Sequence, residues 1–368
     1  MSHRLPTLYP KVEPWPGIQL YYPPVKYYPA RNEYESVEDA CVRLRERSLL
    51  SKPHTLLLDL EDGCRLKKES REVLRRELPR LNKGKTRIAL RINPFLTEEY
   101  HHDLQLVADL APFLDDVVLA KAGEAYGEAE IRDLSAFLAK VNPEIRIQPI
   151  IEHPKSLKIA HKLMNYDTVK HVVFGIHDFS KAMAFHISPE GWQEQLKPFM
   201  TELLLEARLL GRGVIGGVEV LINKEPLPEN HVEPDDVRRW LDLRGDRESR
   251  IVYQHAVNEV AMGFTGKQVI HPNHVHLCRV AFVPSSTEIR RHKKILTLAM
   301  EADALLGGAI RFEDQMLDPP MFGKSLQTLL RAEALGALGE EDIAFVRQVM
   351  EKLPDQVIRE NWPYGVIL

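Results

Sequence analysis

Short apolar runs alternate with segments of helical periodicity along most of this chain. Eight such runs lie near residues 18, 55, 86, 116, 146, 171, 214 and 268. Continuous apolar runs are typical of strands buried on both faces, as in parallel sheets. Strands that alternate with helices form parallel βαβ units, and eight of them predict an α/β fold closed into a TIM (β/α)8 barrel. An open doubly wound sheet is the alternative, but no GxGxxG motif follows the first run.

One of these units, residues 146–181, suggests a chemical site. Its two runs, RIQPII and HVVFGI, flank SLKIAHKLMNY, whose apolar residues have helical spacing. Glu152 follows the first run and Asp178 the second. Neighbouring parallel strands bring their carboxyl ends to one face, where ligands bind, so the two carboxylates can share one hard cation such as Mg²⁺. Taken singly, each acid could instead cap the helix that it precedes.

The ends of the other expected strands hold a compact set of polar residues. These are Asp59, Glu61, Asp62, Arg91, Asn93, Lys121, Glu219 and His271. Charged residues at the carboxyl ends of barrel strands point to the active-site mouth. Acids that flank a few basic groups suit a divalent cation bridging to an anionic substrate.

Two interpretations stay open for each group. Asp59, Glu61 and Asp62 form either a solvated acidic turn or acceptors for metal-bound waters. Arg91 either joins a surface ion pair or holds a carboxylate or enolate oxygen with its planar guanidinium. Lys121 either has a similar role or is the structural partner of an acid.

The chain is expected to divide into three parts. Residues 1–17 are rich in proline and predict an extended N-terminal arm. Residues 18–283 predict the barrel, with a polar insertion near 223–250. Residues 284–368 show helical patterns alone and predict a C-terminal helical extension that could close as a lid over the barrel mouth. Near the start of the barrel, residues 37–50 have helical spacing, and Ser36 is the expected N-cap.

Charge and cysteine usage limit the partners and the compartment. The net charge of -4 and the pI near 6.4 provide no general attraction for nucleic acid or anionic lipid. The three cysteines include no CxxC pair and are expected to be reduced thiols. No run approaches the roughly 20 apolar residues that cross a bilayer, and no apolar signal segment opens the chain. We therefore expect a soluble, cytoplasmic protein without a membrane or nucleic-acid partner.

Several motifs resemble those of a known family. They are LLLDLEDG, RIN, the IE of PIIEHP, FGIHDFSKAM, GFTGKQVIHP, AFVPSSTEI and GGAIRFEDQMLDPP. Their order and strand positions resemble the citrate lyase β-subunit and malyl-CoA lyase group of the HpcH/HpaI aldolase and citrate lyase family. The similarity covers roughly residues 55–322, and GFTGKQVIHP and the GGAI string are its most specific parts.

The resemblance implies a role for particular residues. Glu152 and Asp178 would bind Mg²⁺, and Arg91 would contact a substrate oxygen. Asp314 matches the acid of a family string that, in several members, enters the active site from a neighbouring subunit. The resemblance also implies a homo-oligomer, a trimer or hexamer, in which Asp314 could act in trans. It places Asp59 and Glu61 near the metal water and the substrate.

This chain departs from the family pattern in three places. The arginine-bearing turn after the first strand is replaced by YYPPVKYYPARN, where Lys26 or Arg31 could substitute for the arginine. The family's PKVE string reads AKAGE, so Lys121 is retained and the acid is displaced. Gln315 replaces a glycine after Asp314. These changes fall where substrate choice and coenzyme A recognition would be decided.

We therefore predict a Mg²⁺-dependent carbon-carbon lyase of the retro-Claisen or retro-aldol type. Its substrate would be a 3-hydroxy dicarboxylic acid or the coenzyme A thioester of one, and its ligands would include a small keto acid. Arg91, Lys121 and Asp314 are the candidate catalytic residues, and Arg91, Asp59, Glu61 and Lys26 the candidate substrate contacts. A thioesterase or free-acid aldolase with the same metal site is one alternative. A catalytically silent barrel that serves as a binding or assembly subunit is the other.

Overall fold

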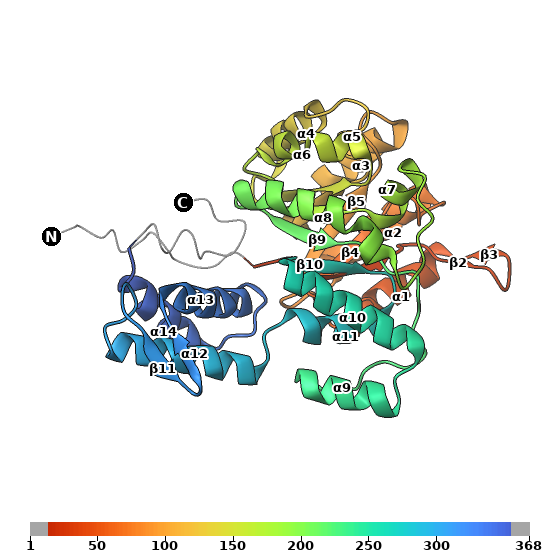
Figure 1. The fold of residues 1–368 in the computed structure, drawn as a ribbon. Coiled ribbons are helices and arrows are strands. Elements are labelled where there is room, and N and C mark those ends of the chain that lie inside the picture. Colours follow the sequence, from red (N-terminus) through yellow and green to blue (C-terminus); the bar gives the residue numbers. More distant parts are fainter. Residues whose placement is uncertain (1–13, 355–368) are drawn as a thin grey trace.

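A closed barrel of eight parallel strands forms the main body of the computed structural model, which describes residues 14–354 (Figure 1). Each strand pairs with its neighbour in the chain, and β10 closes the barrel by pairing with β1. The strands are β1 (Ile18–Tyr22), β4 (Thr55–Asp59), β5 (Arg87–Ile92), β6 (Asp116–Leu119), β7 (Arg146–Ile151), β8 (His171–Phe174), β9 (Gly213–Gly216) and β10 (Gly266–Val269). The predicted TIM barrel and its eight strands are confirmed.

Helices surround the barrel in the intervals between the strands. They are α1 (Val37–Arg47), α2 (Lys67–Glu77), α3 (Glu98–Leu110), α4 (Ala129–Val141), α5 (Pro154–Lys158), α6 (Ala160–Met164), α7 (Ile176–Ala182), α8 (Trp192–Leu209), α9 (Pro234–Leu243), α10 (Arg247–Met262) and α11 (Pro272–Phe282). The expected N-cap is confirmed, because the Ser36 side chain accepts a hydrogen bond from the Asp39 backbone N–H. The one helix expected between β7 and β8 is divided into α5 and α6 at Ile159.

Alternate strand residues point into the barrel, as the two-residue period of a strand requires. Six of them form an apolar interior cluster: Leu57, Ala89, Val118, Ile150, Val173 and Ile215. The intervening residues join the larger core between the barrel and its helices. Two positions beyond Leu57, Ala89 and Ile150, the inward faces end in polar side chains at the carboxyl ends of the strands, which we call the mouth of the barrel.

The last part of the described chain forms a smaller unit with its own core. It contains α12 (Ser286–Glu301), the hairpin of β11 (Ile310–Phe312) and β12 (Gln315–Leu317), α13 (Pro319–Ala334) and α14 (Glu340–Glu351). The expectation that residues 284–368 would contain helices alone was wrong, because the β11–β12 hairpin lies between α12 and α13. Strands of three residues are too short for an alternation pattern to be recognised.

This C-terminal unit packs near the amino-terminal ends of the strands. Trp15, just before β1, belongs to its core and donates a backbone hydrogen bond to the Ala334 carbonyl at 2.8 Å. The Trp15 ring also contacts His171, the first residue of β8, with centroids 6.2 Å apart. The β2–β3 hairpin (Tyr27–Tyr28 and Glu33–Tyr34) follows β1 at the opposite end, and Figure 1 shows the two features on opposite sides of the barrel. Within one chain, the C-terminal unit therefore does not cover the mouth.

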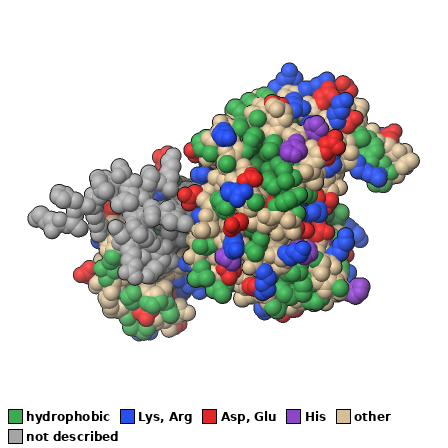
Figure 2. Space-filling view, turned by 90° about the horizontal axis from the view of Figure 1, so that it is seen from above, with side chains coloured by type: hydrophobic (Ala, Val, Ile, Leu, Met, Phe, Trp, Pro, Cys, Tyr) green, Lys and Arg blue, Asp and Glu red, His purple; other side chains and the backbone are tan. Residues whose placement is uncertain are grey.

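Two further features concern the segments outside the barrel strands. The polar region near 223–250 contains α9, which packs against α11. Most of the expected N-terminal arm, residues 1–13, lies outside the described residues, as do residues 355–368. In the described range, no helix combines the length and apolar character that a membrane span needs. Figure 2 shows basic and acidic side chains interspersed on the face that it displays.

His171 should make the fold sensitive to acid. Its side chain is buried, and this burial, with Arg87 nearby, lowers its pKa to about 3 from an ordinary 6.5. A base whose pKa is depressed by folding stabilises the fold fully above its unfolded pKa and loses that contribution as the pH falls toward the folded pKa.

We expect the melting temperature of the wild type to fall more steeply than that of His171→Phe between about pH 6.5 and 4.5. The substitution keeps an aromatic ring against Trp15 and removes the titrating group. Thermal melts at several pH values measure this difference. Parallel pH profiles of the two proteins would contradict the assignment.

Candidate active site

An arginine and an aspartate face each other across neighbouring strands at the mouth. Asp59 is the last residue of β4, and Arg91 is its direct partner in the register of β5. Arg91 Nε donates to Asp59 Oδ1 at 2.7 Å and Nη2 donates to Oδ2 at 2.8 Å, a bidentate pair that fixes the guanidinium plane. Asp59 also accepts hydrogen bonds from the backbone N–H groups of Glu61 and Gly63, at 2.9 and 3.2 Å.

Glu61 joins this pair to a second cation. Its Oε2 lies 3.1 Å from Arg91 Nη1, and its Oε1 accepts a hydrogen bond from Lys121 Nζ at 2.6 Å. Burial opposes the charge on Lys121, but the hydrogen bond and charge of Glu61 outweigh it, so the pKa of Lys121 is raised. Of the two interpretations of Lys121, the structure therefore supports a structural partner of an acid. Asp62 is more exposed and lies 3.7 Å from the same amine.

The backbone of Lys121 also holds the first predicted metal ligand. Lys121 has a left-handed conformation, with φ of 51°. In this conformation its N–H donates to Glu152 Oε1 at 2.6 Å. The turn after β6 thus positions Glu152 through the backbone and Glu61 through the side chain.

Glu152 and Asp178 lie near enough at the mouth for their charges to interact. Glu152 directly follows β7, whereas Asp178 lies in the first turn of α7, the helix after β8. Burial raises the pKa of Glu152 to about 8; Lys121 opposes this rise, and the charges of Asp178 and Glu61 add to it. The positive charge near Glu152 therefore does not compensate for the burial of its carboxylate and for the neighbouring negative charges.

This electrostatic deficit fits a divalent cation. A cation between Glu152 and Asp178 would offset both the burial and the repulsion of the carboxylates. No group of three or more His, Cys, Asp or Glu side chains forms a complete metal cage within residues 14–354. Two carboxylates with the remaining positions left to water and substrate oxygens match the preference of Mg²⁺.

Two predicted residues lie apart from this cluster. Lys26 is in the loop after β1, where burial lowers its pKa and its charge influences His271. Within the described residues, no hydrogen bond or ion pair joins Lys26 to Arg91 or Glu152. Asp314 is exposed on the turn of the β11–β12 hairpin, in the unit at the far end of the barrel. Asp314 therefore does not reach this mouth within one chain.

The remaining strand-end residues have structural partners. Asn93 accepts a hydrogen bond from Lys67 and donates one to Asp103. Glu219 accepts a hydrogen bond from Trp192 Nε1 and pairs with Lys267 in a buried cluster between the barrel and its helices. His271 caps α11 by accepting a hydrogen bond from the Asn273 N–H.

Sequence reasoning missed two residues at the mouth. Glu124 is the displaced acid of AKAGE; burial raises its pKa, and its charged neighbours include His153, Lys121 and Asp178. Its position three residues after Lys121 was the available signal. Tyr21 places its ring against Arg91, 4.8 Å from the guanidinium carbon. No local signal marks Tyr21, because an aromatic residue in a strand is ordinary.

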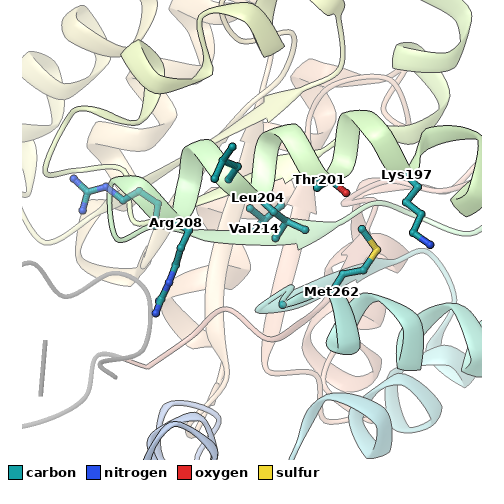
Figure 3. A pocket seen from close by; sticks show the side chains of 9 residues that line it. Lys197, Thr201, Leu204, Arg208, Val214 and Met262 are labelled. Atoms are coloured by element: carbon teal, nitrogen blue, oxygen red, sulfur yellow. The ribbon is translucent and has the colours of Figure 1, made fainter. Parts of the chain in front are cut away.

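A separate hollow lies on the outer side of the barrel, away from these residues. Its volume is about 450 Å³, and Figure 3 shows it between α8 and the strand β9, with Met262 at one side. Leu204, Val214 and Met262 make it apolar, and Lys197, Arg208 and Arg212 contribute positive charge. None of the predicted site residues lines it.

Gly175 offers a direct test of the Glu152 position. A Cβ on this residue would lie 2.5 Å from Glu152 Cβ and 3.1 Å from Oε2, so a side chain there must displace the carboxylate. We expect Gly175→Ala to weaken Mg²⁺ binding by about 10-fold or more, although both acids remain. Calorimetric titration with Mg²⁺ measures this.

Gly339→Ala is the matched control, because a Cβ there has no heavy atom within 4 Å. The control should bind Mg²⁺ as the wild type does. Equal affinities in Gly175→Ala and the wild type would show that Glu152 is not a ligand.

The comparisons with known proteins agree with this architecture. No family model matches the chain. It is 26% identical over 290 residues to a citrate lyase subunit beta-like protein of Deinococcus radiodurans, covering 77% of this chain and 90% of the relative. It is 25% identical over 287 residues to a (3S)-malyl-CoA thioesterase of Cereibacter sphaeroides, covering 77% and 88%. A shorter match, 36% over 75 residues and 20% of this chain, is to the human mitochondrial citramalyl-CoA lyase, 22% of which it covers.

Solved structures share the fold. A citrate lyase from Burkholderia xenovorans aligns with a TM-score of 0.63 at 18% identity, covering 91% of this chain and 97% of that one. CitE of Mycobacterium tuberculosis, solved with magnesium, acetoacetate and coenzyme A, aligns with a TM-score of 0.57 at 20% identity, covering 87% and 98%. The fold is thus that of the citrate lyase β-subunit barrels. The resemblance to the citrate lyase β-subunit and malyl-CoA group is confirmed.

Proposed function

We propose that this protein is a Mg²⁺-dependent carbon-carbon lyase acting on a 3-hydroxy dicarboxylic acid or its coenzyme A thioester. One observation carries the proposal: the same barrel mouth holds Glu152, whose pKa is raised by burial and by the charge of Asp178, and the guanidinium of Arg91, which Asp59 fixes. The first accepts a cation and the second accepts an anion. The names of the relatives, which include a citramalyl-CoA lyase and citrate lyase β subunits, support the same class.

The proposed reaction breaks the bond between the carbon that bears the hydroxyl and the carbon next to the thioester carbonyl. The hydroxyl proton passes to a base, and that carbon becomes the carbonyl carbon of a 2-oxo (keto) acid. The bonding electrons pass to the thioester fragment as an enolate, which then takes up a proton. Mg²⁺ held by Glu152 and Asp178 would supply Lewis-acid polarisation of the substrate oxygens.

Arg91 would stabilise the anionic part of the substrate or the enolate. Its Nε and one N–H of Nη2 donate to Asp59, and Nη1 faces Glu61. A guanidinium has five N–H donors, so further donors on Nη1 and Nη2 remain for a substrate oxygen. Lys121 would act indirectly, since its amine neutralises Glu61 and its N–H orients Glu152.

The proton-transfer group is proposed to come from a second copy of the chain. Asp314 is exposed on a hairpin remote from its own barrel mouth. A homo-oligomer that seats this hairpin over a neighbouring mouth would place the carboxylate near the enolate. Asp314→Asn should then abolish turnover while Mg²⁺ binding persists.

A thioesterase with the same site is a second candidate, because one relative has that name. Water would then add to the thioester carbonyl and release the thiol of coenzyme A with the intact dicarboxylic acid. Product analysis after incubation with malyl-CoA and citramalyl-CoA separates the two. A lyase yields a keto acid and an acyl-CoA, whereas a thioesterase yields free thiol without a keto acid.

A silent binding barrel is tested by calorimetry. The lyase and the thioesterase both require Mg²⁺ to bind, and oxaloacetate should bind more tightly once Mg²⁺ is present. Absence of Mg²⁺ binding together with absence of oxaloacetate binding would favour the silent barrel.

A further inference from the structure

Tyr21 is held in one orientation inside the mouth. It lies on the inward face of β1, two residues after Gln19, and packs against the interior apolar cluster. Its hydroxyl donates to Gln268 Oε1 at 3.1 Å. The side chain therefore bonds to the neighbouring strand, β10, on the inner face of the barrel.

A ladder of glutamines fixes the acceptor of that hydroxyl. Gln268 Nε2 donates to Gln19 Oε1 at 2.9 Å, and Gln19 Nε2 donates to Gln148 Oε1 at 2.7 Å. The three amides are buried in an otherwise apolar interior. Each of the three amide oxygens accepts one hydrogen bond from within this group. The donor to the oxygen of Gln268, at the end nearest the mouth, is the hydroxyl of Tyr21. The hydrogen bonds that these side chains make with one another fix their orientation in the barrel interior.

The ring of Tyr21 covers one face of Arg91. The guanidinium carbon lies 4.8 Å from the ring centroid, within the range of a cation–π contact. Asp59 and Glu61 hold the edges of the same guanidinium. The plane is thus fixed by carboxylates at its edges and by an aromatic ring against one face, and the group cannot tilt toward Tyr21 without losing these contacts.

We propose that Tyr21 is a positioning residue for the reaction, which sets the orientation in which Arg91 meets the substrate oxygen. This inference rests on the proposed lyase function for its catalytic consequence. The geometric part, that Tyr21 and its glutamine ladder hold Arg91, concerns the protein alone. The two parts can therefore be tested separately.

Two substitutions of Tyr21 distinguish the contribution of its ring from that of its hydroxyl. Tyr21→Leu removes the ring, and we expect kcat/KM to fall by about 10- to 30-fold, whereas the Mg²⁺ affinity stays as in the wild type. Tyr21→Phe keeps the ring and loses only the bond to Gln268, so it should restore most of that loss. A structural defect alone would lower stability and Mg²⁺ binding together.

A double-mutant cycle shows whether Tyr21 acts through Arg91. In an Arg91→Lys background, Tyr21→Leu should have little further effect on kcat/KM, since the group that it positions is already gone. Additive losses would overturn the inference. Equal kcat/KM in Tyr21→Leu and the wild type would overturn it as well.

A readout without substrate completes the test. The Nε–H resonance of Arg91, identified by its absence from Arg91→Lys, should shift and exchange faster with water in Tyr21→Leu and much less so in Tyr21→Phe. An unchanged resonance in Tyr21→Leu would contradict the positioning role. If the wild type cleaves no thioester, the proposed function fails, and this resonance still decides whether Tyr21 orients Arg91.

Discussion

Asp178→Asn should abolish Mg²⁺-dependent turnover, with a loss of more than about 100-fold in kcat, while the fold is retained. The substitution keeps the size and shape of the side chain and removes the negative charge that would bind the cation. Glu152 would then face Mg²⁺ as the remaining carboxylate, buried and held by the Lys121 N–H. Steady-state kinetics over a range of Mg²⁺ concentrations, with calorimetry of Mg²⁺ binding, measure the effect.

Asp242→Asn provides the matched control. Asp242 is exposed on α9, in the polar segment between β9 and α10. The same chemical change there should leave kcat and Mg²⁺ affinity as in the wild type. Full turnover by Asp178→Asn would remove Asp178 from the metal site.

Arg91→Lys should lower kcat/KM by about 100-fold or more while changing Mg²⁺ affinity little. Lysine keeps the positive charge but cannot make the bidentate bond to Asp59 and also present donors to the substrate. The expected result is therefore that Mg²⁺ affinity is retained, whereas kcat/KM falls because recognition of the anionic substrate is lost. Kinetics with the thioester and calorimetry with Mg²⁺ distinguish the two effects.

An exposed arginine controls for the substitution itself. Arg132 on α4 donates a hydrogen bond to its neighbour Asp133 at 2.9 Å, and both side chains are exposed. Arg132→Lys should behave as the wild type. A parallel loss of Mg²⁺ affinity in Arg91→Lys would indicate that Arg91 supports the metal ligands rather than the substrate.

The barrel could be predicted from the sequence because its strands are apolar on both faces and its helices have a different period. The carboxylate pair could be predicted for the same reason, since Glu152 directly follows β7, Asp178 lies in the first helical turn after β8, and parallel strands end at one face. The repulsion between Glu152 and Asp178 agrees with that expectation. Their role as ligands stays a prediction.

The partners of Arg91 could not be predicted from a local pattern. Its contact with Asp59 depends on the register of two strands separated by 32 residues in the chain. Lys121 adopts a left-handed backbone conformation, which lets its N–H reach Glu152. This conformation could not be predicted from the sequence either, because lysine rarely adopts positive φ. The placement of Asp314 depends on how a second core packs against the barrel.

The measurement that tests the central claim most directly is keto acid release from malyl-CoA and citramalyl-CoA, with and without Mg²⁺. The account predicts that the wild type releases a keto acid together with an acyl-CoA only when Mg²⁺ is present. Keto acid release that is equally fast after Mg²⁺ has been removed by a chelator would contradict it, as would the absence of any keto acid from both thioesters at saturating Mg²⁺.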